Sequence, residues 1–199
     1  TLRGPRGGMI LCKDWLSRYV DGGCPLVMGG PLPHVMAAKA IALKEALSDD
    51  FKDYARRIVK NSKALANRLV ENGFKVQTNG TDNHIVLLDV TKYSLTGRQA
   101  EDALLECGIV TNRNALPNDK NGAWYTSGLR LGTPALTTRG FTEEDMIEVE
   151  DIIDDVLSNV TPKVGSKVKY TIDTESVARN KKRVEALLDK HPLYGEIEI

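Results

Sequence analysis

Apolar residues recur at helical spacing along much of the chain. Between Asp50 and Asn72 they return every three or four residues, which predicts a helix with one buried face, and Gly73 is placed to end it. Residues 34–47 are rich in alanine and apolar almost all round, so they predict a helix that is buried on every side. Weaker patterns predict further helices over residues 13–20, 97–107 and 174–190. A Pro/Gly linker over residues 161–165 precedes the last of them.

One more helix has a complete start signal. Thr142 is the expected N-cap, and Asp145 takes the acidic position of a capping box. Phe141 and Met146 have the spacing of a hydrophobic staple across that start. The pattern therefore predicts a helix that begins directly after Thr142.

Short apolar runs predict strands over residues 9–12, 74–77, 84–89 and 109–111. Another short strand is predicted just before Pro134, which ends it. Leu129 and Leu131 alternate with Arg130 there, so Arg130 points to the opposite face of the strand. Its planar guanidinium suits a carboxylate or a phosphate, because it makes two parallel charge-assisted hydrogen bonds. An arginine that is simply exposed on an edge strand is the alternative interpretation.

Two connecting segments have more than one interpretation. The polar loop over residues 112–126 exceeds the usual length of a connection, which is typical of functional or disordered loops. Its residues Trp124 and Tyr125 either pack on a flat ligand or anchor the loop. Gly29 and Gly30 either let backbone N–H groups approach a phosphate closely or simply form a turn.

The composition is that of an ordinary globular protein. Among its 199 residues, 27 basic and 27 acidic side chains balance. This balance argues against nucleic acid and anionic membranes as partners, and leaves small molecules and other subunits. No apolar run reaches the roughly 20 residues of a membrane span, and no signal peptide is recognisable, so we expect a cytoplasmic protein.

The cysteines exclude two kinds of site. Cys12, Cys24 and Cys107 are odd in number and widely spaced, without a Cys-x-x-Cys pair. This arrangement disfavours both a disulfide framework and a structural zinc site. We therefore expect buried free thiols and no metal site.

Five groups of residues share an order and an approximate spacing that point to a known family. They are Thr1-Leu-Arg-Gly-Pro-Arg-Gly-Gly8, Gly29-Gly-Pro-Leu32 with His34 and Ala37-Ala-Lys39, Gly80-Thr-Asp-Asn-His84, Asn112-Arg-Asn114 with Pro117-Asn-Asp119, and Ser127-Gly-Leu-Arg-Leu-Gly-Thr-Pro-Ala135. Taken together, they resemble serine hydroxymethyltransferase over about residues 1–158.

The resemblance implies an α/β protein of the pyridoxal-phosphate fold type I, which is the aspartate-aminotransferase-like fold. Residues 1–48 would form the C-terminal part of the large cofactor-binding domain, and residues 49–199 a complete α+β small domain. The implied enzyme transfers a hydroxymethyl group between serine and tetrahydrofolate, giving glycine and methylenetetrahydrofolate. It would bind pyridoxal phosphate, take tetrahydrofolate as co-substrate, and form a homodimer or tetramer whose active sites are shared between subunits.

The resemblance also concerns the start of the chain. In the family, the lysine that carries the cofactor directly precedes the motif that begins here at Thr1. The chain would then start one position after that lysine, as a C-terminal fragment of a longer enzyme or as a chain that another chain completes. We accordingly expect no catalytic residue within it.

Several binding residues follow from the same resemblance. Arg130 matches the arginine that binds the substrate carboxylate. Gly29 and Gly30 match glycines whose backbone amides reach the cofactor phosphate of the neighbouring subunit. Arg6, like Arg3, matches an arginine close to the cofactor-binding lysine. The folate-contacting region corresponds to Asn114, Asn121, Gly122, Ala123 and Trp124.

Two departures from the family pattern keep other functions open. Met28 stands where a glutamine is usual, and Ala123 where a proline is usual. They are compatible with a folate-independent aldolase or transaldolase, or with a methylserine-type transferase, on the same scaffold. An inactive partner subunit that completes another chain's site is the alternative from a different class. Folate-dependent turnover would distinguish the hydroxymethyltransferase from the folate-independent enzymes. A lysine before Thr1 would distinguish an enzyme from an inactive partner subunit.

Overall fold

The computed structural model describes residues 2–193, which contain both helices and short strands and confirm the expected α/β class. Two compact units divide the chain, one up to Ala55 and one from Arg56 onward. The expected domain boundary between residues 48 and 49 stays a prediction for the complete protein. Thr1 and residues 194–199, which belong to the expected motifs and domains, lie outside the described residues.

The first unit consists of extended segments and helices. The 3-10 helix Asp14–Leu16 continues into α1 (Ser17–Asp21), in agreement with the helix expected over residues 13–20. After a turn, α2 (Pro33–Ala46) follows, and α3 (Asp49–Glu71) begins in this unit. The Nζ atom of Lys39 donates to the Gly8 carbonyl at 2.9 Å, which attaches the N-terminal segment to α2.

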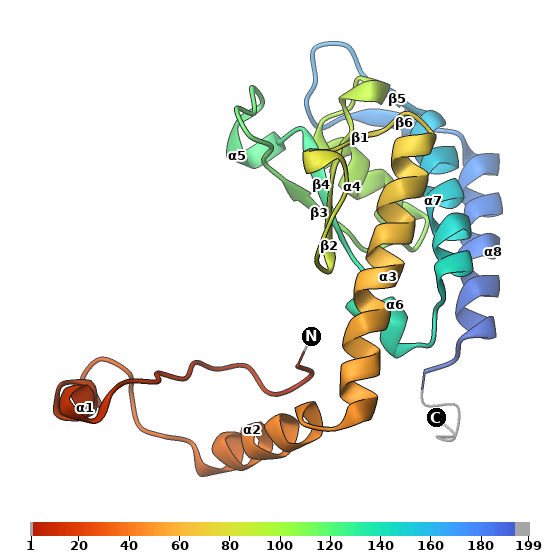
Figure 1. Cartoon of the computed structure of the whole chain (residues 1–199). Helices are drawn as coiled ribbons and strands as arrows, with labels where there is room; N and C mark the ends of the chain where they lie inside the picture. Colours follow the sequence, from red (N-terminus) through yellow and green to blue (C-terminus); the bar gives the residue numbers. More distant parts are fainter. Residues whose placement is uncertain (1, 194–199) are drawn as a thin grey trace. The chain divides into compact units, whose positions relative to one another are not determined.

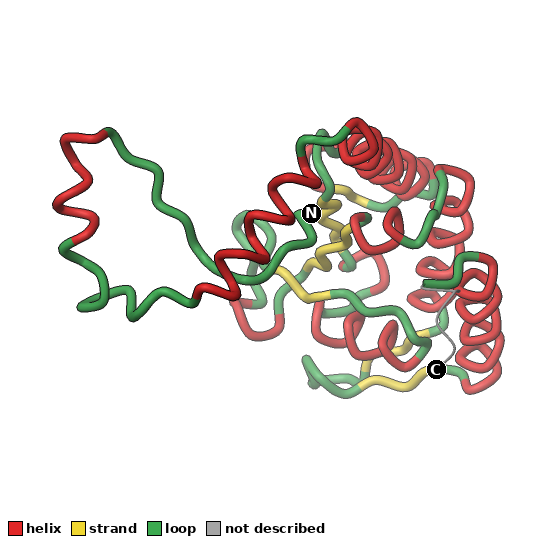
Figure 2. The backbone as a smooth tube through the Cα atoms, turned by 90° about the horizontal axis from the view of Figure 1, so that it is seen from below, coloured by secondary structure: helices red, strands yellow, loops and turns green. Residues whose placement is uncertain are grey.

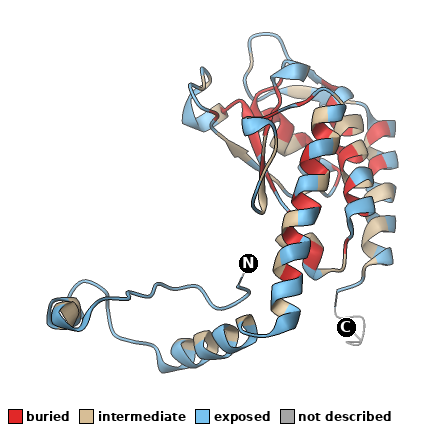
Figure 3. Ribbon diagram, viewed as in Figure 1, coloured by how far each residue is buried: buried red, intermediate tan, exposed pale blue. Residues whose placement is uncertain are grey.

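Two burial predictions for this unit are wrong. No residue of α2 is buried, and Met36 and Ile41 are 59% and 62% exposed. Residues 9–12 form no strand and are exposed, because no described segment of the unit provides a neighbouring strand. Figure 3 shows the same contrast, with buried residues concentrated in the second unit. An apolar sequence is buried only where a second surface covers it.

The cysteines divide between the two units. Cys107 is a buried free thiol, as expected, whereas Cys12 and Cys24 are free but exposed. Burial raises the pKa of the Cys107 thiol, so it stays protonated at neutral pH.

The second unit is built on a four-stranded antiparallel sheet with the order β1-β2-β4-β3. Its strands are β1 (Lys75–Val76), β2 (Ile85–Asp89), β3 (Asn112–Asn114) and β4 (Gly128–Gly132). Figure 2 shows that all strands, drawn in yellow, belong to this unit. β4 is a central strand that pairs with β2 along its full length and with β3 on its other edge.

One face of the sheet packs on helices, as Figure 1 shows. The helices that contribute side chains to this core are α3, α4 (Gly97–Glu106), α6 (Pro134–Thr138), α7 (Glu143–Ser158) and α8 (Thr174–Lys190), whereas α5 (Gly122–Tyr125) buries no residue. The apolar core joins Leu69 of α3, Leu88 of β2, Leu104 of α4, Leu129 of β4 and Ile152 of α7. No helix within residues 2–193 combines the length and the apolar character that crossing a membrane requires.

Two strand assignments differ from the sequence-based expectation. The predicted strand over residues 109–111 is wrong, because the ladder with β4 starts only at Asn112. β3 is an edge strand whose residues are exposed or only partly buried, so it can consist of the polar residues Asn112–Asn114. The expected linker over residues 161–165 instead overlaps β5 (Val160–Pro162), which pairs with β6 (Tyr170–Ile172).

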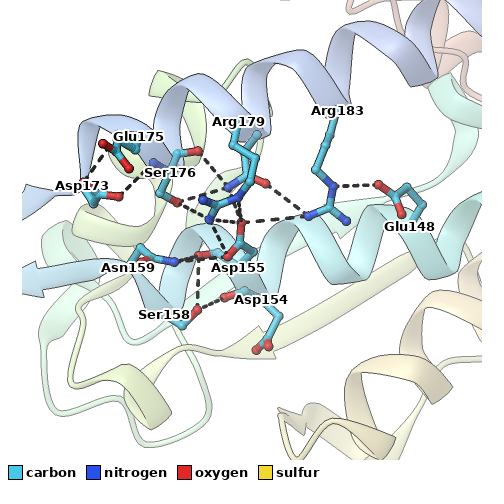
Figure 4. A network of polar contacts seen from close by, with 11 residues as sticks. Glu148, Asp154, Asp155, Ser158, Asn159, Asp173, Glu175, Ser176, Arg179 and Arg183 are labelled. Carbon is cyan, nitrogen blue, oxygen red and sulfur yellow. Dashed lines mark hydrogen bonds and ion pairs between the residues drawn. The ribbon is translucent and has the colours of Figure 1, made fainter.

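Polar contacts fasten α8 to α7 (Figure 4). The carboxylate of Asp155 accepts hydrogen bonds from Arg179 Nη2 at 2.7 Å and from the fully buried Asn180 Nδ2 at 2.7 Å. Burial opposes ionisation of Asp155, but these hydrogen bonds outweigh it and lower the pKa of the carboxyl group. The charged network therefore holds the C-terminal helix at neutral pH.

The start signal of α7 is confirmed. Thr142 accepts a hydrogen bond from the Asp145 N–H, and the Thr142 N–H donates to Asp145 Oδ2 at 2.8 Å. Phe141 and Met146, the expected staple, are both buried. The capping box thus fixes the first turn of the helix that carries much of the core.

We predict that Thr142→Ala lowers the free energy of unfolding by about 1 kcal/mol, the usual effect of removing an N-cap oxygen. Urea unfolding of the protein measures this change. Thr174→Ala is the matched control, because Thr174 is an exposed threonine at the first position of α8. An equal effect of both substitutions would contradict a special role of Thr142.

Glu150 of α7 is a fully buried acid. Asn72 Nδ2 donates to its Oε2 atom at 2.7 Å, and Arg68 Nε lies 3.5 Å from the same oxygen, while Oε1 has no hydrogen-bond partner among the described residues. Burial and the neighbouring Asp151 raise the pKa of Glu150. The folded protein consequently binds this proton more tightly than the unfolded chain does.

Protonated Glu150 therefore stabilises the folded state fully below the usual pKa of a glutamate. This contribution is lost as the pH rises toward neutrality. Between about pH 5 and pH 7, Glu150→Gln should lose less stability than the original protein, by on the order of 1 kcal/mol. Urea unfolding at both pH values tests this. The exposed Glu144 provides the control Glu144→Gln, which should leave the pH dependence unchanged.

Candidate functional site

The strand β4 presents Arg130 as the sequence predicts. Leu129 and Leu131 are 0% and 5% exposed and face the core, whereas Arg130 is exposed on the opposite face. In the ladder, Arg130 pairs with Leu87 of β2 and with Asn112 of β3. The backbone at Arg130 is thus fixed from both edges.

Arg130 differs from most other arginines of the second unit. Five of these pair with carboxylates: Arg68, Arg98, Arg113, Arg179 and Arg183. No described residue forms a hydrogen bond or ion pair with Arg130. Its guanidinium therefore keeps all its donors for an anion from outside the described chain.

A hollow of about 390 Å³ lies over this part of the sheet. Arg130, Asn112, Thr111 and His84 are among the residues that line it. Asn112 is directly opposite Arg130 in the antiparallel ladder, so both side chains share one face. The hydroxyl of Thr111 is buried and has no partner among the described residues. The hollow thus combines a cation with uncharged polar groups, which suits a small carboxylate.

The sequence did not single out Asn112 and Thr111 as site residues. In the sequence, Asn112 is part of a family motif, and Thr111 ends an expected strand. The signal that finds them is the register between β3 and β4, which is a tertiary property.

The expected folate residues lie at the end of β3 and on the segment that connects it to β4. Asn114 is half-buried at the end of β3, and its side chain donates to the Ala115 carbonyl at 2.8 Å. Asn121 precedes α5, which contains Gly122, Ala123 and Trp124. The expected long loop is therefore partly ordered as β3 and α5.

Trp124 is 64% exposed, so its indole is not an anchor buried in the core. The guanidinium of Arg113 lies 5.5 Å from the centre of the Trp124 ring, and the Arg113 side chain is itself paired with Glu101. Tyr125 is half-buried and has Lys167 Nζ 5.5 Å from its ring centre. The loop thus exposes the ring of Trp124 and partly covers the ring of Tyr125.

Gly97 lets α4 approach the end of this segment and β4 closely, and Gly128 lets the start of the segment approach β4. An added Cβ at Gly128 would lie 2.5 Å from Leu116 Cδ2 and 2.8 Å from the Asn114 carbonyl. An added Cβ at Gly97 would lie 2.5 Å from the Gly128 carbonyl. The site therefore depends on the absence of side chains at both positions.

The other expected site residues lie in the first unit. Gly29 has a φ of 74° and its N–H donates to the Pro25 carbonyl at 2.9 Å, so that donor is used within the turn. Gly30 is exposed, and no described group accepts its N–H. Arg6 is exposed, while the Arg3 guanidinium lies 4.2 Å from the Tyr54 ring centre. Of the two glycines, Gly30 thus has the backbone donor that fits a phosphate oxygen.

Comparison with known proteins decides the family. A family model described as serine hydroxymethyltransferase matches residues 1–153. The chain belongs to the serine hydroxymethyltransferase family. The resemblance inferred from the five sequence motifs is therefore confirmed.

Curated serine hydroxymethyltransferases are similar to this chain at high identity. The protein from Salinispora tropica is 55% identical over 100% of the chain and 43% of its own length. That from Mycolicibacterium smegmatis is 55% identical over 98% of the chain and 40% of its own length. That from Treponema pallidum is 50% identical over 100% of the chain and 35% of its own length. The chain thus spans about two fifths of the length of the relatives it matches.

We predict that Gly128→Ala lowers the free energy of unfolding by about 1 to 3 kcal/mol, because the methyl group overlaps Leu116 and a backbone carbonyl. Gly132→Ala is the matched control on the same strand, since the nearest atom to its added Cβ lies at 3.6 Å. Urea unfolding of both variants measures the difference. Equal stability of the two would contradict the close approach at Gly128.

Proposed function

We propose that the chain is the C-terminal part of a longer enzyme that transfers a hydroxymethyl group between serine and tetrahydrofolate, giving glycine and methylenetetrahydrofolate. Family membership and relatives that carry the name serine hydroxymethyltransferase support this reaction. The observation that carries the proposal is the guanidinium of Arg130, which has no partner within residues 2–193 and lines a hollow over a central strand of the sheet.

Arg130 binds the carboxylate of the amino acid in this proposal. A bidentate pair fixes both the position and the plane of the carboxylate, so the substrate is oriented as well as bound. Asn112 lines the same hollow and has an amide available to a polar substrate group. The two residues together favour a small polar amino acid over an apolar ligand.

Pyridoxal phosphate fits the polar residues of the first unit. The N–H of Gly30, which no described group accepts, suits the cofactor phosphate of the neighbouring subunit, with Gly29 providing the turn. The exposed cation of Arg6 suits the anionic cofactor near the lysine that carries it. When bound, the cofactor supplies the electron sink for breaking a bond at the amino acid's α-carbon. The roles of this chain's own residues are to hold the phosphate and to orient the substrate.

Tetrahydrofolate binds at the segment between β3 and β4. The exposed Trp124 offers an aromatic face for a flat ring, and Asn114 and Asn121 carry amide groups on β3 and on the same segment. Ala123 and Gly122 leave this surface without bulky side chains.

The fold type, the domain boundaries and the oligomeric state that we propose are those that the family resemblance implies. We propose fold type I, in which residues 1–48 belong to the large domain and residues 49–199 to the small domain, in a cytoplasmic homodimer or tetramer with shared active sites. Exposed apolar side chains in the first unit support this arrangement, because surfaces of that kind are covered by further protein. They include Ile10, Leu11, Trp15, Leu26 and Val27.

In the complete enzyme, Arg130→Ala should lower kcat/KM for serine by about 30-fold to several thousand-fold, because truncating a desolvated charge pair costs about 2 to 5 kcal/mol. Arg130→Lys should recover part of the loss, since it keeps the charge but loses the planar fork. Steady-state kinetics with serine and tetrahydrofolate measure both effects.

Arg98→Ala is the control, because Arg98 is a helical arginine paired with Asp102 at 3.2 Å. It should leave serine kinetics unchanged, and pyridoxal phosphate should remain bound in all variants. Normal serine kinetics in Arg130→Ala would reject the carboxylate role. Loss of the cofactor in that variant would instead assign Arg130 a structural role.

A further inference from the structure

The carboxylate of Asp119 lies at the centre of the loop between β3 and β4. Its Oδ2 atom accepts hydrogen bonds from the backbone N–H groups of Leu116 at 3.1 Å and Ser127 at 2.7 Å. Its Oδ1 atom accepts from the Asn121 N–H at 2.9 Å and from the Ser127 hydroxyl at 2.7 Å. Four donors therefore use the full accepting capacity of one carboxylate.

These four bonds determine the path of the loop. They connect its first part at Leu116 with its last residue, Ser127, and they fix the backbone at Asn121, where α5 begins. The side chain of Asn121 donates to the Ser127 hydroxyl at 3.0 Å and closes the ring of contacts. Asn121 makes no capping bond to α5 with its own side chain, so Asp119 provides the polar contact at the start of that helix.

Two further backbone hydrogen bonds reach the loop only at its C-terminal end, from the Gly97 N–H to the Thr126 carbonyl and from the Val90 N–H to the Ser127 carbonyl, both at 3.0 Å. α5 has only 4 residues, which is too short for a helix to be stable by itself. Asn118, Gly122 and Thr126 have positive φ values of 59°, 72° and 55°, a conformation that costs energy in the two residues that are not glycine. The contacts of Lys167 and Arg113 with the aromatic rings, at 5.5 Å, are weak at exposed positions.

Arg130 does not depend on the same contacts. Its strand is paired on both edges, with Leu87 on one side and Asn112 on the other. A change at Asp119 therefore leaves the carboxylate site in place while it releases residues 121–124.

The charge of Asp119 is part of this arrangement. Partial burial opposes its ionisation, but the hydrogen bonds from Ser127, Asn121 and Leu116 outweigh that effect and lower the pKa of Asp119. The ionised carboxylate accepts hydrogen bonds and donates none, as the four surrounding donors require, whereas the protonated group would direct an O–H at one of them. An asparagine in its place would direct an NH2 group at two of the donors.

We propose that Asp119 is a positioning residue for tetrahydrofolate: it holds residues 121–124 in the geometry that binds the folate ring, without touching the ligand. The inference rests on the proposed function and deepens it. It separates folate binding from serine binding within one enzyme, because one loop carboxylate controls the first and a doubly paired strand controls the second.

Steady-state kinetics on the complete enzyme carrying Asp119→Asn test this. The KM for tetrahydrofolate should rise about 10- to 100-fold, as expected when a binding group is displaced by about 1 Å. The KM for serine, and kcat for folate-free cleavage of a 3-hydroxy amino acid, should change less than about threefold. Ser127→Ala removes one of the four bonds and should give an intermediate rise.

The matched control is Asp82→Asn, which changes an exposed aspartate that lies 3.2 Å from Lys63 in another loop of the same unit. It should leave both KM values unchanged. Equal increases in the KM for serine and for tetrahydrofolate, in Asp119→Asn and in Ser127→Ala alike, would mean a general structural role and overturn the proposal.

Hydrogen exchange of the enzyme without substrates gives a readout that does not need turnover. The amides of Leu116, Asn121 and Ser127 should exchange faster in Asp119→Asn, while those of Leu129 and Leu131 keep their protection. Unchanged exchange in the loop, or an unchanged KM for tetrahydrofolate in an active enzyme, would overturn the role of Asp119. Absence of tetrahydrofolate-dependent turnover in the original enzyme would instead reject the proposed function, and the folate role of Asp119 with it.

Discussion

The pairing of β4 with strands on both edges is the constraint on which the second unit depends. β2 and β3 fix the register of β4, and this register directs Leu129 and Leu131 into the core. Because side chains alternate along a strand, Arg130 must then lie on the opposite face. A shift by one residue would bury the guanidinium and expose the leucines. The stability of the core and the position of the candidate site are therefore consequences of one ladder.

Carboxylates organise the parts of the unit that the apolar core does not reach. Asp119 shapes a loop, and Asp155 attaches α8 to α7, each through several hydrogen bonds that favour the ionised form. Glu150 shows the opposite balance, because its burial exceeds what Asn72 and Arg68 compensate. Arg130 is a fourth case, a charge with no partner among the described residues. An exposed unpaired cation costs little until a ligand removes its water, which is what a binding site requires.

The two units differ in how much of their own apolar surface they bury. The second unit encloses a continuous core from α3 to α8. The first leaves every residue of α2 at least partly exposed, together with Leu11 and Trp15, although its sequence is as apolar as that of a buried helix. Exposed apolar surface of this kind supports the proposal that further protein covers the first unit. This agrees with a chain that covers 43% of its relative from Salinispora tropica.

Local sequence determined the features whose causes are local. The capping box at Thr142, the periodicity of α3 and the alternation around Arg130 each involve residues close together in the chain, so their patterns predict them directly. Only the tertiary structure decided three other features. They are the strand Asn112–Asn114, the lack of a partner for Arg130 among the described residues, and the four hydrogen bonds that Asp119 accepts. They depend on which segments meet across the sheet and the loop, and burial likewise depends on the covering surface. No local pattern contains that information, because it arises when residues distant in sequence come into contact.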